Sequence, residues 1–256
     1  EIIEYPGIWR TAFGVNNKQE NVFLNFGSGE RNGVLISNEI SDYQLLFNTK
    51  SVQLKIYDSE SILEEEMINI SSRWIDHFHS EQNVVGYVYG VLHSNGYKEA
   101  FKNDLRKTLP RIPLLNHQEK YIEIGLRLAE LHLNYEQYPS WNGVEVVISN
   151  SNPNYKVTKM KHPKKGVLDT IIYNEHITIT NIPEKAYEYV VNGRPAIEWI
   201  IDQYRVKTDK KSGITDDPNE FSDDPKYILN LLLSIITVSM KTLELIEELP
   251  EFEIID

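Results

Sequence analysis

The chain has 256 residues, 41% of them hydrophobic, which is enough to bury a large core as one domain or as two lobes that share an interface. It contains no cysteine, which excludes disulfides, thiolate metal sites and cysteine nucleophiles. A formal net charge of −12 argues against nucleic-acid binding, because lysine and arginine make most protein contacts to phosphate.

The first part of the chain, residues 1–58, alternates short apolar runs with Asn and Gly, a pattern that predicts short strands joined by turns. The strand candidates are residues 22–26, 33–37 and 52–57. Helical spacing of apolar residues follows, and it predicts helices at residues 61–78, 84–92, 97–107 and 117–135. Pro110 and Pro113 stop the third of these helices.

From Val144 the apolar period changes toward two, which predicts strands at residues 144–148, 156–160, 167–173 and 177–182. Helical stretches return at residues 183–190 and 196–204, separated by Gly193. Asp224 followed by Pro225 predicts the N-cap and first position of a last helix that ends near residue 249. Its apolar run at 228–240 is too short to cross a bilayer, so we expect it to be buried.

The order of helices, sheet and helices predicts an α+β fold, with a helical lobe packed with a small, mostly antiparallel sheet and a long C-terminal helix. The negative charge is concentrated in three stretches without Lys or Arg: residues 60–66 carry −4, residues 216–224 carry −5 and residues 244–256 carry −6. Together they carry −15 against a total of −12, so the rest of the chain is at +3. We therefore expect the acid on separate faces, which leaves room for a basic groove.

Residues 156–165, which we call the lysine segment, contain five lysines and no acid: Lys156, Lys159, Lys161, Lys164 and Lys165. Two strands joined by a turn would place several of these ammonium groups along one edge, spaced to meet successive phosphates. A solvated hairpin is the structural alternative, because lysine also protects exposed edge strands from pairing.

A second basic group follows the predicted helix at 196–204 and consists of Arg205, Lys207, Lys210 and Lys211. Cations are favoured at a helix end, and they can also pair with Asp202 or Asp209 in a structural network. Arg205 directly follows an apolar helix, so a half-buried role in holding the loop is open to it. The three lysines are freer to meet DNA.

A third basic group comprises Lys98, Lys102, Arg106, Lys107 and Arg111. Lys98, Lys102 and Arg106 are spaced four residues apart on one helix face, and such a face is normally just solvated. Arg111 stands between two prolines, and we expect it to contact DNA or to dock the domain onto a neighbour.

Base reading requires side chains such as Arg, Asn or Gln held at a groove. The candidates are Asn152, flanked by Asn150 and Asn154, and Asn174, which precedes His176 at a turn. Turns also need Asn, so a structural role competes for each of them. The sequence contains neither a P-loop nor a G-x-S-x-G elbow, and His77 and His79, two residues apart on a predicted helix, point in different directions, so no metal site is predicted.

Four segments carry a resemblance to a known family: GRPAIEWIIDQYRVKTDKKSGITDDPN at residues 193–219, HS-x-x-Y at 93–97, FKNDLRKTLPRIPL at 101–114 and DDPKYILNLLLSIITVSMKT at 223–242. In these segments the chain resembles the C-terminal specificity domain of the type ISP restriction-modification enzymes, and the similarity runs from about residue 32 to residue 250. The strings RVKTDKKSGI and LPRIPL are the most distinctive, because neither helical nor strand patterning alone produces them.

Enzymes of that family are single bacterial chains with nuclease, helicase-like ATPase, adenine methyltransferase and target-recognition parts. The resemblance implies that residues 59–256 recognise a DNA target, and that residues 1–58 form a strand-rich segment that could close the preceding methyltransferase part. It implies double-stranded DNA and the methyltransferase and helicase parts as partners, no membrane, and a location in the bacterial cytoplasm. A start at Glu1 also leads us to expect a piece of a longer parent.

The resemblance further implies that this chain catalyses nothing and holds no cofactor or metal, whereas the parent uses S-adenosylmethionine, ATP and magnesium. Two other functions stay open. A module that docks onto the helicase or methyltransferase part, with little DNA contact, would suit the net charge and would show an apolar patch instead of a positive groove. An independent enzyme would need a polar pocket with strongly perturbed titrating groups, and the sequence offers no assembled candidate.

Overall fold

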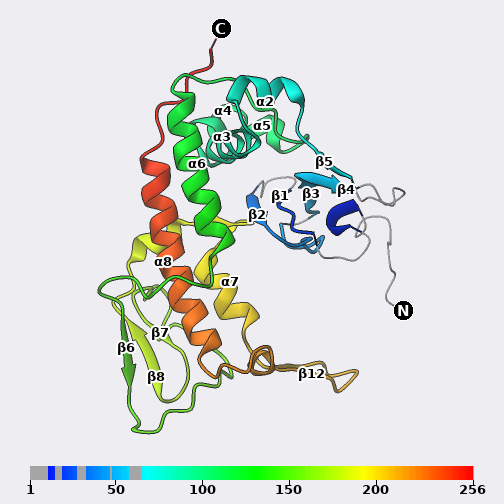
Figure 1. Ribbon diagram of the computed structural model, residues 1–256. Coiled ribbons are helices and arrows are strands. Elements are labelled where there is room, and N and C mark those ends of the chain that lie inside the picture. The colour runs from blue at the N-terminus through cyan, green and yellow to red at the C-terminus, as the bar shows by residue number, and fades with distance from the viewer. Residues whose placement is uncertain (1–10, 15–18, 28–32, 47, 58–64, 256) are drawn as a thin grey trace. The chain divides into compact units, whose positions relative to one another are not determined.

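The computed structural model describes residues 11–14, 19–27, 33–46, 48–57 and 65–255. Its internal contacts divide the chain into two compact units: unit 1 comprises Glu1–Leu133 and Leu245–Asp256, and unit 2 comprises Asn134–Glu244. Figure 1 shows both as ribbons. Most of the acidic run at 60–66 and the predicted helix start at residue 61 lie outside the described residues.

The strands of unit 1 are short and antiparallel: β1 (Phe23–Phe26) lies between β2 (Val34–Ser37) and β3 (Lys50–Gln53), and β4 (Lys55–Tyr57) pairs with β5 (Glu66–Ile68). The side chain of the buried Asn25 of β1 forms hydrogen bonds to both neighbouring strands. Its Nδ2 donates to Ser37 Oγ on β2, and its Oδ1 accepts from Ser51 Oγ on β3. The strand predicted at 52–57 is therefore two strands, since β3 ends at Gln53 and β4 begins at Lys55.

The helices that follow in unit 1 are α2 (Ser72–Phe78), α3 (Glu81–His93), α4 (Asn95–Ala100), α5 (Lys102–Leu105) and α6 (Gln118–Leu133). Serine hydroxyls begin two of them, because Ser80 Oγ accepts from Asn83 N at α3 and Ser94 Oγ accepts from Tyr97 N at α4. α3 packs along α6, and Tyr87 and Tyr121 are fully buried between the helices and their surroundings.

Glycines allow α3 and α6 to approach at backbone distance. A Cβ added to Gly125 of α6 would lie 1.7 Å from the carbonyl oxygen of Gly86 and 2.7 Å from the amide nitrogen of Gly90, both on α3. A Cβ on Gly90 would lie 2.3 Å from the carbonyl oxygen of Tyr121. Non-bonded atoms do not approach this closely, so this helix pair requires glycine at these positions.

Unit 2 contains a three-stranded antiparallel sheet and two small hairpins. The sheet has the order β6 (Glu145–Ile148), β8 (Ile177–Thr180), β7 (Ile171–Ile172), and the hairpins pair β9 (Val190–Val191) with β10 (Arg194–Pro195) and β11 (Lys207–Thr208) with β12 (Thr215–Asp216). Asn192 and Gly193 have positive φ angles of 52° and 76°, as a two-residue hairpin turn of type I′ requires.

The remaining elements of unit 2 are the 3-10 helices η2 (Glu184–Glu188) and η3 (Pro218–Glu220) and the α-helices α7 (Ala196–Gln203) and α8 (Tyr227–Glu247), the last of which ends in unit 1. Ile177 and Ile179 of β8 alternate with threonines and meet Leu232 and Ile236 of α8 in one core. α8 is long and apolar enough to span a bilayer, but 78% of its most apolar window is buried inside the protein. The buried helix predicted at 228–240 is confirmed.

Several predicted elements differ from the structure in the type or the length of the secondary structure. The single helix predicted at 61–78 is wrong, because β5 pairs with β4 and, within the described residues 65–78, only α2 is helical. The helix predicted at 97–107 is divided at Phe101 into α4 and α5. Residues 183–190 form the 3-10 helix η2 and then enter β9, and the strand predicted at 167–173 is limited to β7.

The α+β class, the small antiparallel sheet and the long last helix are confirmed. Asp224 Oδ1 accepts from Lys226 N in the turn before α8, which begins at Tyr227, so the predicted helix start at Pro225 is two residues early. A boundary near residue 58 between a preceding part and the recognition domain stays a prediction.

Replacing the glycines of the α3–α6 contact should destabilise the fold in a graded order. Gly125→Ala forces a methyl group against rigid backbone, and we expect it to lower the free energy of unfolding by about 3 kcal/mol. A Cβ on Gly86 would lie 2.7 Å from Cγ of Leu126 and 2.9 Å from the carbonyl oxygen of Ile122, contacts less severe than the 1.7 Å at Gly125, so Gly86→Ala should cost less, about 2 kcal/mol. Urea unfolding followed by circular dichroism measures both, and equal costs would contradict the proposed backbone contact.

Candidate nucleic-acid interface

The lysine segment runs over the surface of unit 2 without regular secondary structure. Its five lysines are exposed, whereas Val157 and Met160, each 1% exposed, anchor the segment in the core. Only Lys161 joins a strand, through an isolated antiparallel bridge to Ile172. The strand predicted at 156–160 is therefore wrong, because buried residues three apart and irregular backbone do not make a two-residue period.

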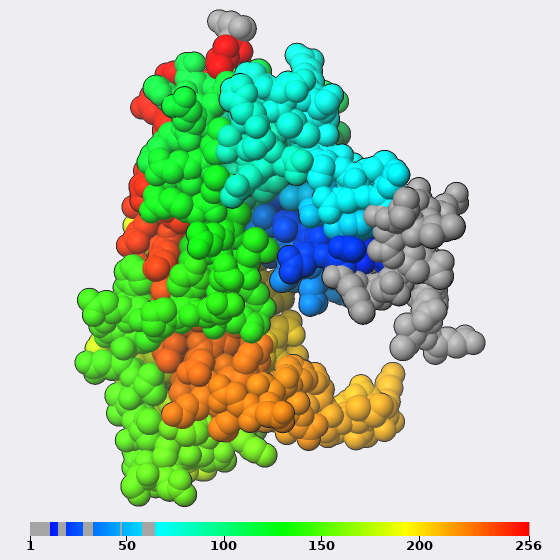
Figure 2. All heavy atoms as spheres, viewed as in Figure 1, coloured from blue at the N-terminus to red at the C-terminus, as the bar shows by residue number. Residues whose placement is uncertain are grey.

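The second basic group lies mainly on the hairpin of β11 and β12, which we call the basic hairpin (residues 207–216). It extends away from the rest of unit 2 (Figures 1 and 2). Lys210 and Lys211 stand in its loop, and Lys207 lies on β11. The basic hairpin has almost no packed side chains, so its shape depends on its own hydrogen bonds.

Asp209 organises the loop of the basic hairpin. Its Oδ1 accepts from the amide nitrogens of Lys211 at 3.0 Å and Ser212 at 2.7 Å, and from Ser212 Oγ at 2.9 Å. These bonds stabilise the ionised carboxylate and hold the pKa of Asp209 below its ordinary value. Gly213 completes the turn with a φ of 72°, a left-handed conformation that suits glycine.

The structure brings the lysine segment and the basic hairpin together, although they lie far apart in the sequence. Before β11, Val206 N donates to Thr158 O at 3.0 Å. After β12, Asn219 Oδ1 accepts from Val157 N and Asn219 Nδ2 donates to Val157 O, both at 2.8 Å. The backbone at Val157 and Thr158 is thus bonded to both ends of the basic hairpin.

The acids of α7 hold the arginines of this region and His162. His162 Nε2 lies 2.8 Å from Glu198 Oε1, and Arg194 reaches both Glu198 at 3.6 Å and Asp202 at 3.3 Å. Arg205 pairs with Asp202 at 3.2 Å, and its side chain is 36% exposed. Arg205 therefore has the half-buried, structural position that the sequence left open.

None of the eight lysines in the two groups forms a salt bridge with another residue that the structure describes. Acid nevertheless lies near two of them. Lys207 is the cross-strand partner of Asp216, and Lys156 shares the lining of a cavity of about 280 Å³ with Asp223 and Asp224. The expected separation of acidic and basic faces is wrong at this position, although no pair there is close enough for a salt bridge.

The two asparagines proposed to read bases have different surroundings. Asn174 is fully occupied, since its Nδ2 donates to Asn154 O and Lys156 O and its Oδ1 accepts from His176 N and Ile177 N. We correct its assignment to a structural one. Asn152 is exposed, and its side-chain amide makes no hydrogen bond to a described residue, so it stays available for base contact.

Arg111 belongs to unit 1 and is exposed. Its carbonyl oxygen accepts from Tyr97 Oη at 2.9 Å, which fixes the backbone while the guanidinium forms no salt bridge with a described residue. In the same basic group, Lys102 pairs with Glu99 at 3.5 Å. Arg111 remains a candidate for a nucleic-acid or docking contact.

The strongest pKa shifts of described histidine and lysine side chains occur in a buried cluster of unit 1. Tyr89 Oη lies 2.6 Å from His132 Nδ1, and His93 Nδ1 donates to Tyr89 O at 2.8 Å. Desolvation lowers the pKa of His132 to about 3, and that of His93 well below its ordinary value. Desolvation also lowers the pKa of Lys98 to about 8.

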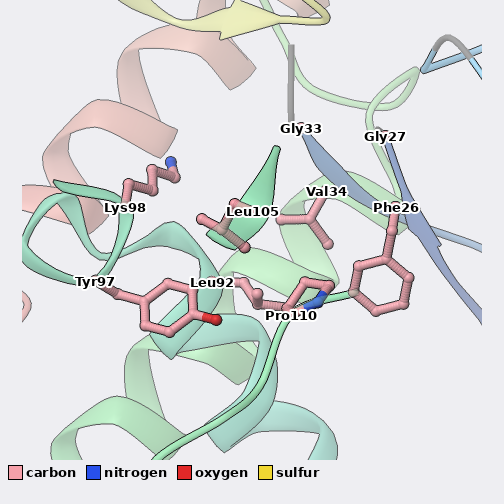
Figure 3. A pocket seen from close by; sticks show the side chains of 9 residues that line it. All are labelled: Phe26, Gly27, Gly33, Val34, Leu92, Tyr97, Lys98, Leu105 and Pro110. Atoms are coloured by element: carbon pink, nitrogen blue, oxygen red, sulfur yellow. The ribbon is translucent and has the colours of Figure 1, made fainter. Parts of the chain in front are cut away.

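Strongly shifted pKa values are common in active sites, but the residues around this cluster leave no space for a substrate. His93 and His132 are buried, and Lys98 lines a cavity of only about 20 Å³, room for about one water molecule (Figure 3). The other lining side chains are mostly apolar, among them Phe26, Leu92 and Leu105. We interpret the cluster as two neutral histidines that the fold has buried and hydrogen-bonded.

A family model and similar solved structures both relate this chain to the type ISP enzymes. The family described as "Type ISP C-terminal specificity domain" matches residues 1–231. Among curated proteins, none matches the chain.

Two similar solved structures are type ISP enzymes. One is a nuclease-deletion mutant of the restriction-modification enzyme LlaGI in complex with a DNA substrate mimic, 58% identical over 93% of this chain and 18% of that chain, with a TM-score of 0.84. The other is the ATP-dependent enzyme LlaBIII bound to DNA, 54% identical over 93% of this chain and 16% of that chain, with a TM-score of 0.87. The chain thus spans less than a fifth of either relative.

A cryo-EM structure of a DrdV–DNA complex has the same fold, with a TM-score of 0.78 over 96% of this chain and 26% of that chain. Its identity to this chain is 22%, so the likeness concerns the fold alone.

Removing the side chain of Asn219 should release the lysine segment from the basic hairpin. Asn219→Ala leaves the buried amide and carbonyl of Val157 without partners, so we expect a loss of about 1–3 kcal/mol in the free energy of unfolding. Amide hydrogen exchange should become faster at Val157 and Val206. Asn152→Ala, which removes an exposed amide, is the matched control, and unchanged exchange in Asn219→Ala would contradict this role.

The buried histidines should make the fold sensitive to acid. His132 is neutral when folded and has an ordinary pKa when unfolded, so the unfolded state binds more protons below about pH 6.5. Stability should therefore fall as the pH decreases from about 6.5 toward 3, by up to about 1.4 kcal/mol per pH unit for each such histidine.

His132→Gln keeps hydrogen-bonding capacity without a group that titrates in this range, and it should flatten the pH dependence. Unfolding curves of both proteins at several pH values measure the difference. An equal slope in the variant would show that His132 is not neutral in the fold.

Proposed function

The chain belongs to the family of type ISP C-terminal specificity domains, and from this premise we propose that it selects the DNA site on which a larger restriction-modification enzyme acts. The relatives LlaGI and LlaBIII were solved with a DNA substrate mimic and with DNA, respectively. In this proposal, double-stranded DNA contacts unit 2 at the lysine segment and the basic hairpin.

One observation carries the proposal: hydrogen bonds join two distant segments whose eight lysines form no salt bridge with a described residue, while the nearby Arg194 and Arg205 pair with acids of α7. Unpaired ammonium groups can meet phosphates without first breaking a salt bridge. Lys156, Lys159 and Lys207 lie within three residues of the joint at Val157, Thr158 and Val206. This arrangement supports a contact surface that follows the DNA backbone.

In this proposal, contacts to phosphate position the domain and do not distinguish sequences. Specificity then depends on side chains that reach base edges and on the shape of the DNA. Asn152 can supply a free amide for such a contact, since it is exposed and follows the sheet strand β6. Arg111 of unit 1 can add a further contact to the backbone or to a neighbouring domain.

We further propose that the chain itself carries no catalytic centre and that the chemistry belongs to the rest of the parent. The parent would cleave DNA and methylate an adenine, using S-adenosylmethionine, ATP and magnesium that are bound outside this chain. It would act in the bacterial cytoplasm. Support comes from the type ISP relatives, of which one is an ATP-dependent enzyme and another had its nuclease deleted.

A docking function remains the second candidate, because β6 is an edge strand that exposes the apolar side chains of Val147 and Ile148. A neighbouring part of the parent could cover this edge. Docking and DNA recognition are compatible in one domain, but docking alone would make the lysines irrelevant to DNA affinity.

The lysines should control both the affinity for DNA and its dependence on salt. We expect Lys156→Glu combined with Lys159→Glu to weaken binding to duplex DNA at all sequences. The slope of log affinity against log salt should become shallower by about one for each phosphate that the variant no longer neutralises. Fluorescence anisotropy with a labelled mixed-sequence duplex, at several salt concentrations, measures both quantities.

The control is the double variant Lys50→Glu with Arg73→Glu, which makes the same change in net charge on exposed side chains of unit 1. It should keep the salt slope of the unmodified chain. If the unit 2 variant binds like this control, the phosphate contacts lie elsewhere; if the unmodified chain binds DNA independently of salt, the DNA function is refuted.

A further inference from the structure

We infer that the tip of the basic hairpin enters the major groove of DNA and that Ile214 packs there against the methyl group of a thymine. This inference rests on the proposed DNA function and names a residue that would read sequence. It concerns a side chain that makes no polar contact and that charge arguments alone would overlook.

Ile214 is the most exposed large hydrophobic side chain among the described residues, at 70%. A single exposed apolar side chain is common on a protein surface. Its position is informative, because the basic hairpin extends away from the rest of unit 2 (Figures 1 and 2) and residues 208–216 are all exposed. The basic hairpin carries three lysines that form no salt bridge with a described residue, Lys210 and Lys211 in the loop and Lys207 on β11, against Asp209 and Asp216. The carboxylate of Asp209 is bonded within the loop, so the two loop lysines favour a polyanionic partner over an apolar protein surface.

The tip is held in a defined shape before any partner binds. Asp209 N donates to Ile214 O at 2.9 Å, and Gly213 N donates to Asp209 O at 2.9 Å. The hydroxyls of Thr208 and Thr215 lie 2.9 Å apart across the strands. With the loop bonds to Asp209 Oδ1, these contacts fix where Ile214 stands, so less conformational entropy is lost when it binds.

The dimensions of the basic hairpin select one groove. A two-stranded ribbon fits the undistorted major groove, which is about 12 Å wide, whereas the minor groove, about 6 Å wide, has to be deformed to admit one. In the major groove the apolar feature of a base pair is the C5-methyl group of thymine. Lys210 and Lys211, in the loop beside Ile214, can then reach the phosphates that border the groove.

Uracil tests this contact, because it lacks only the methyl group of thymine and keeps the same hydrogen-bonding edge. Duplexes recovered by the unmodified chain from a randomised pool are synthesised with thymine or with uracil, and their affinities are compared at one salt concentration. Burial of one methyl group corresponds to roughly a fourfold change in affinity. We expect the unmodified chain to bind the thymine form about fourfold more tightly, and Ile214→Ala to bind both forms equally.

Val190→Ala is the control, since Val190 is 50% exposed on β9 of the same unit, and it should keep the thymine preference. Equal binding of both forms by the unmodified chain would overturn the inference. So would a full thymine preference in Ile214→Ala, because the methyl group would then be read by another residue. In either case a salt-dependent affinity that requires the lysines would leave the proposed DNA function intact, whereas absence of DNA binding would overturn both.

Discussion

The proposed DNA surface depends on one joint, the backbone at Val157 and Thr158. Asn219 bonds the amide and the carbonyl of Val157, and Val206 bonds the carbonyl of Thr158. These bonds satisfy buried polar groups that would otherwise be costly, so the joint is a requirement of folding as well as of position. Because of it, an irregular surface segment and a protruding hairpin present their lysines as parts of one structure.

The net charge of the chain is a poor guide to this surface, because electrostatic attraction to DNA acts over a short range. The Debye length is about 8 Å at physiological salt, so distant acidic residues hardly affect a bound phosphate. Nearby acid has a different consequence. Asp216 opposite Lys207, and Asp223 and Asp224 beside Lys156, lower the sequence-independent attraction at those positions. Weaker nonspecific binding leaves a larger share of the affinity to contacts that distinguish sequences.

The sequence predicted those parts of the fold that local patterns determine. α3, α6 and α8 follow from apolar residues at helical spacing, and β8 follows from the alternation of Ile and Thr. The Asn192–Gly193 pair carries a hairpin signal, whereas the helical prediction for residues 183–190 and 196–204 takes Gly193 only as the separator of two helices. Residues 156–160 could not be predicted in the same way, because their hydrogen bonds go to Val206 and Asn219 and depend on tertiary structure. At position 174 an asparagine suits a base contact and a turn equally. Only the four hydrogen bonds of its side chain, which the structure shows, assign it to the turn.

The division of work between arginine and lysine explains where specificity must lie. The planar guanidinium of arginine matches carboxylates, and Arg194 and Arg205 are held by the acids of α7. Lysine is a flexible point charge, suited to phosphates whose spacing varies little with sequence. If the arginines of unit 2 stabilise the fold and its lysines follow the DNA backbone, direct contacts of unit 2 to base edges fall to uncharged side chains such as Asn152 and Ile214, beside the readout of DNA shape. A domain built in this way can change its target through neutral surface substitutions while its core and its contacts to the DNA backbone stay the same.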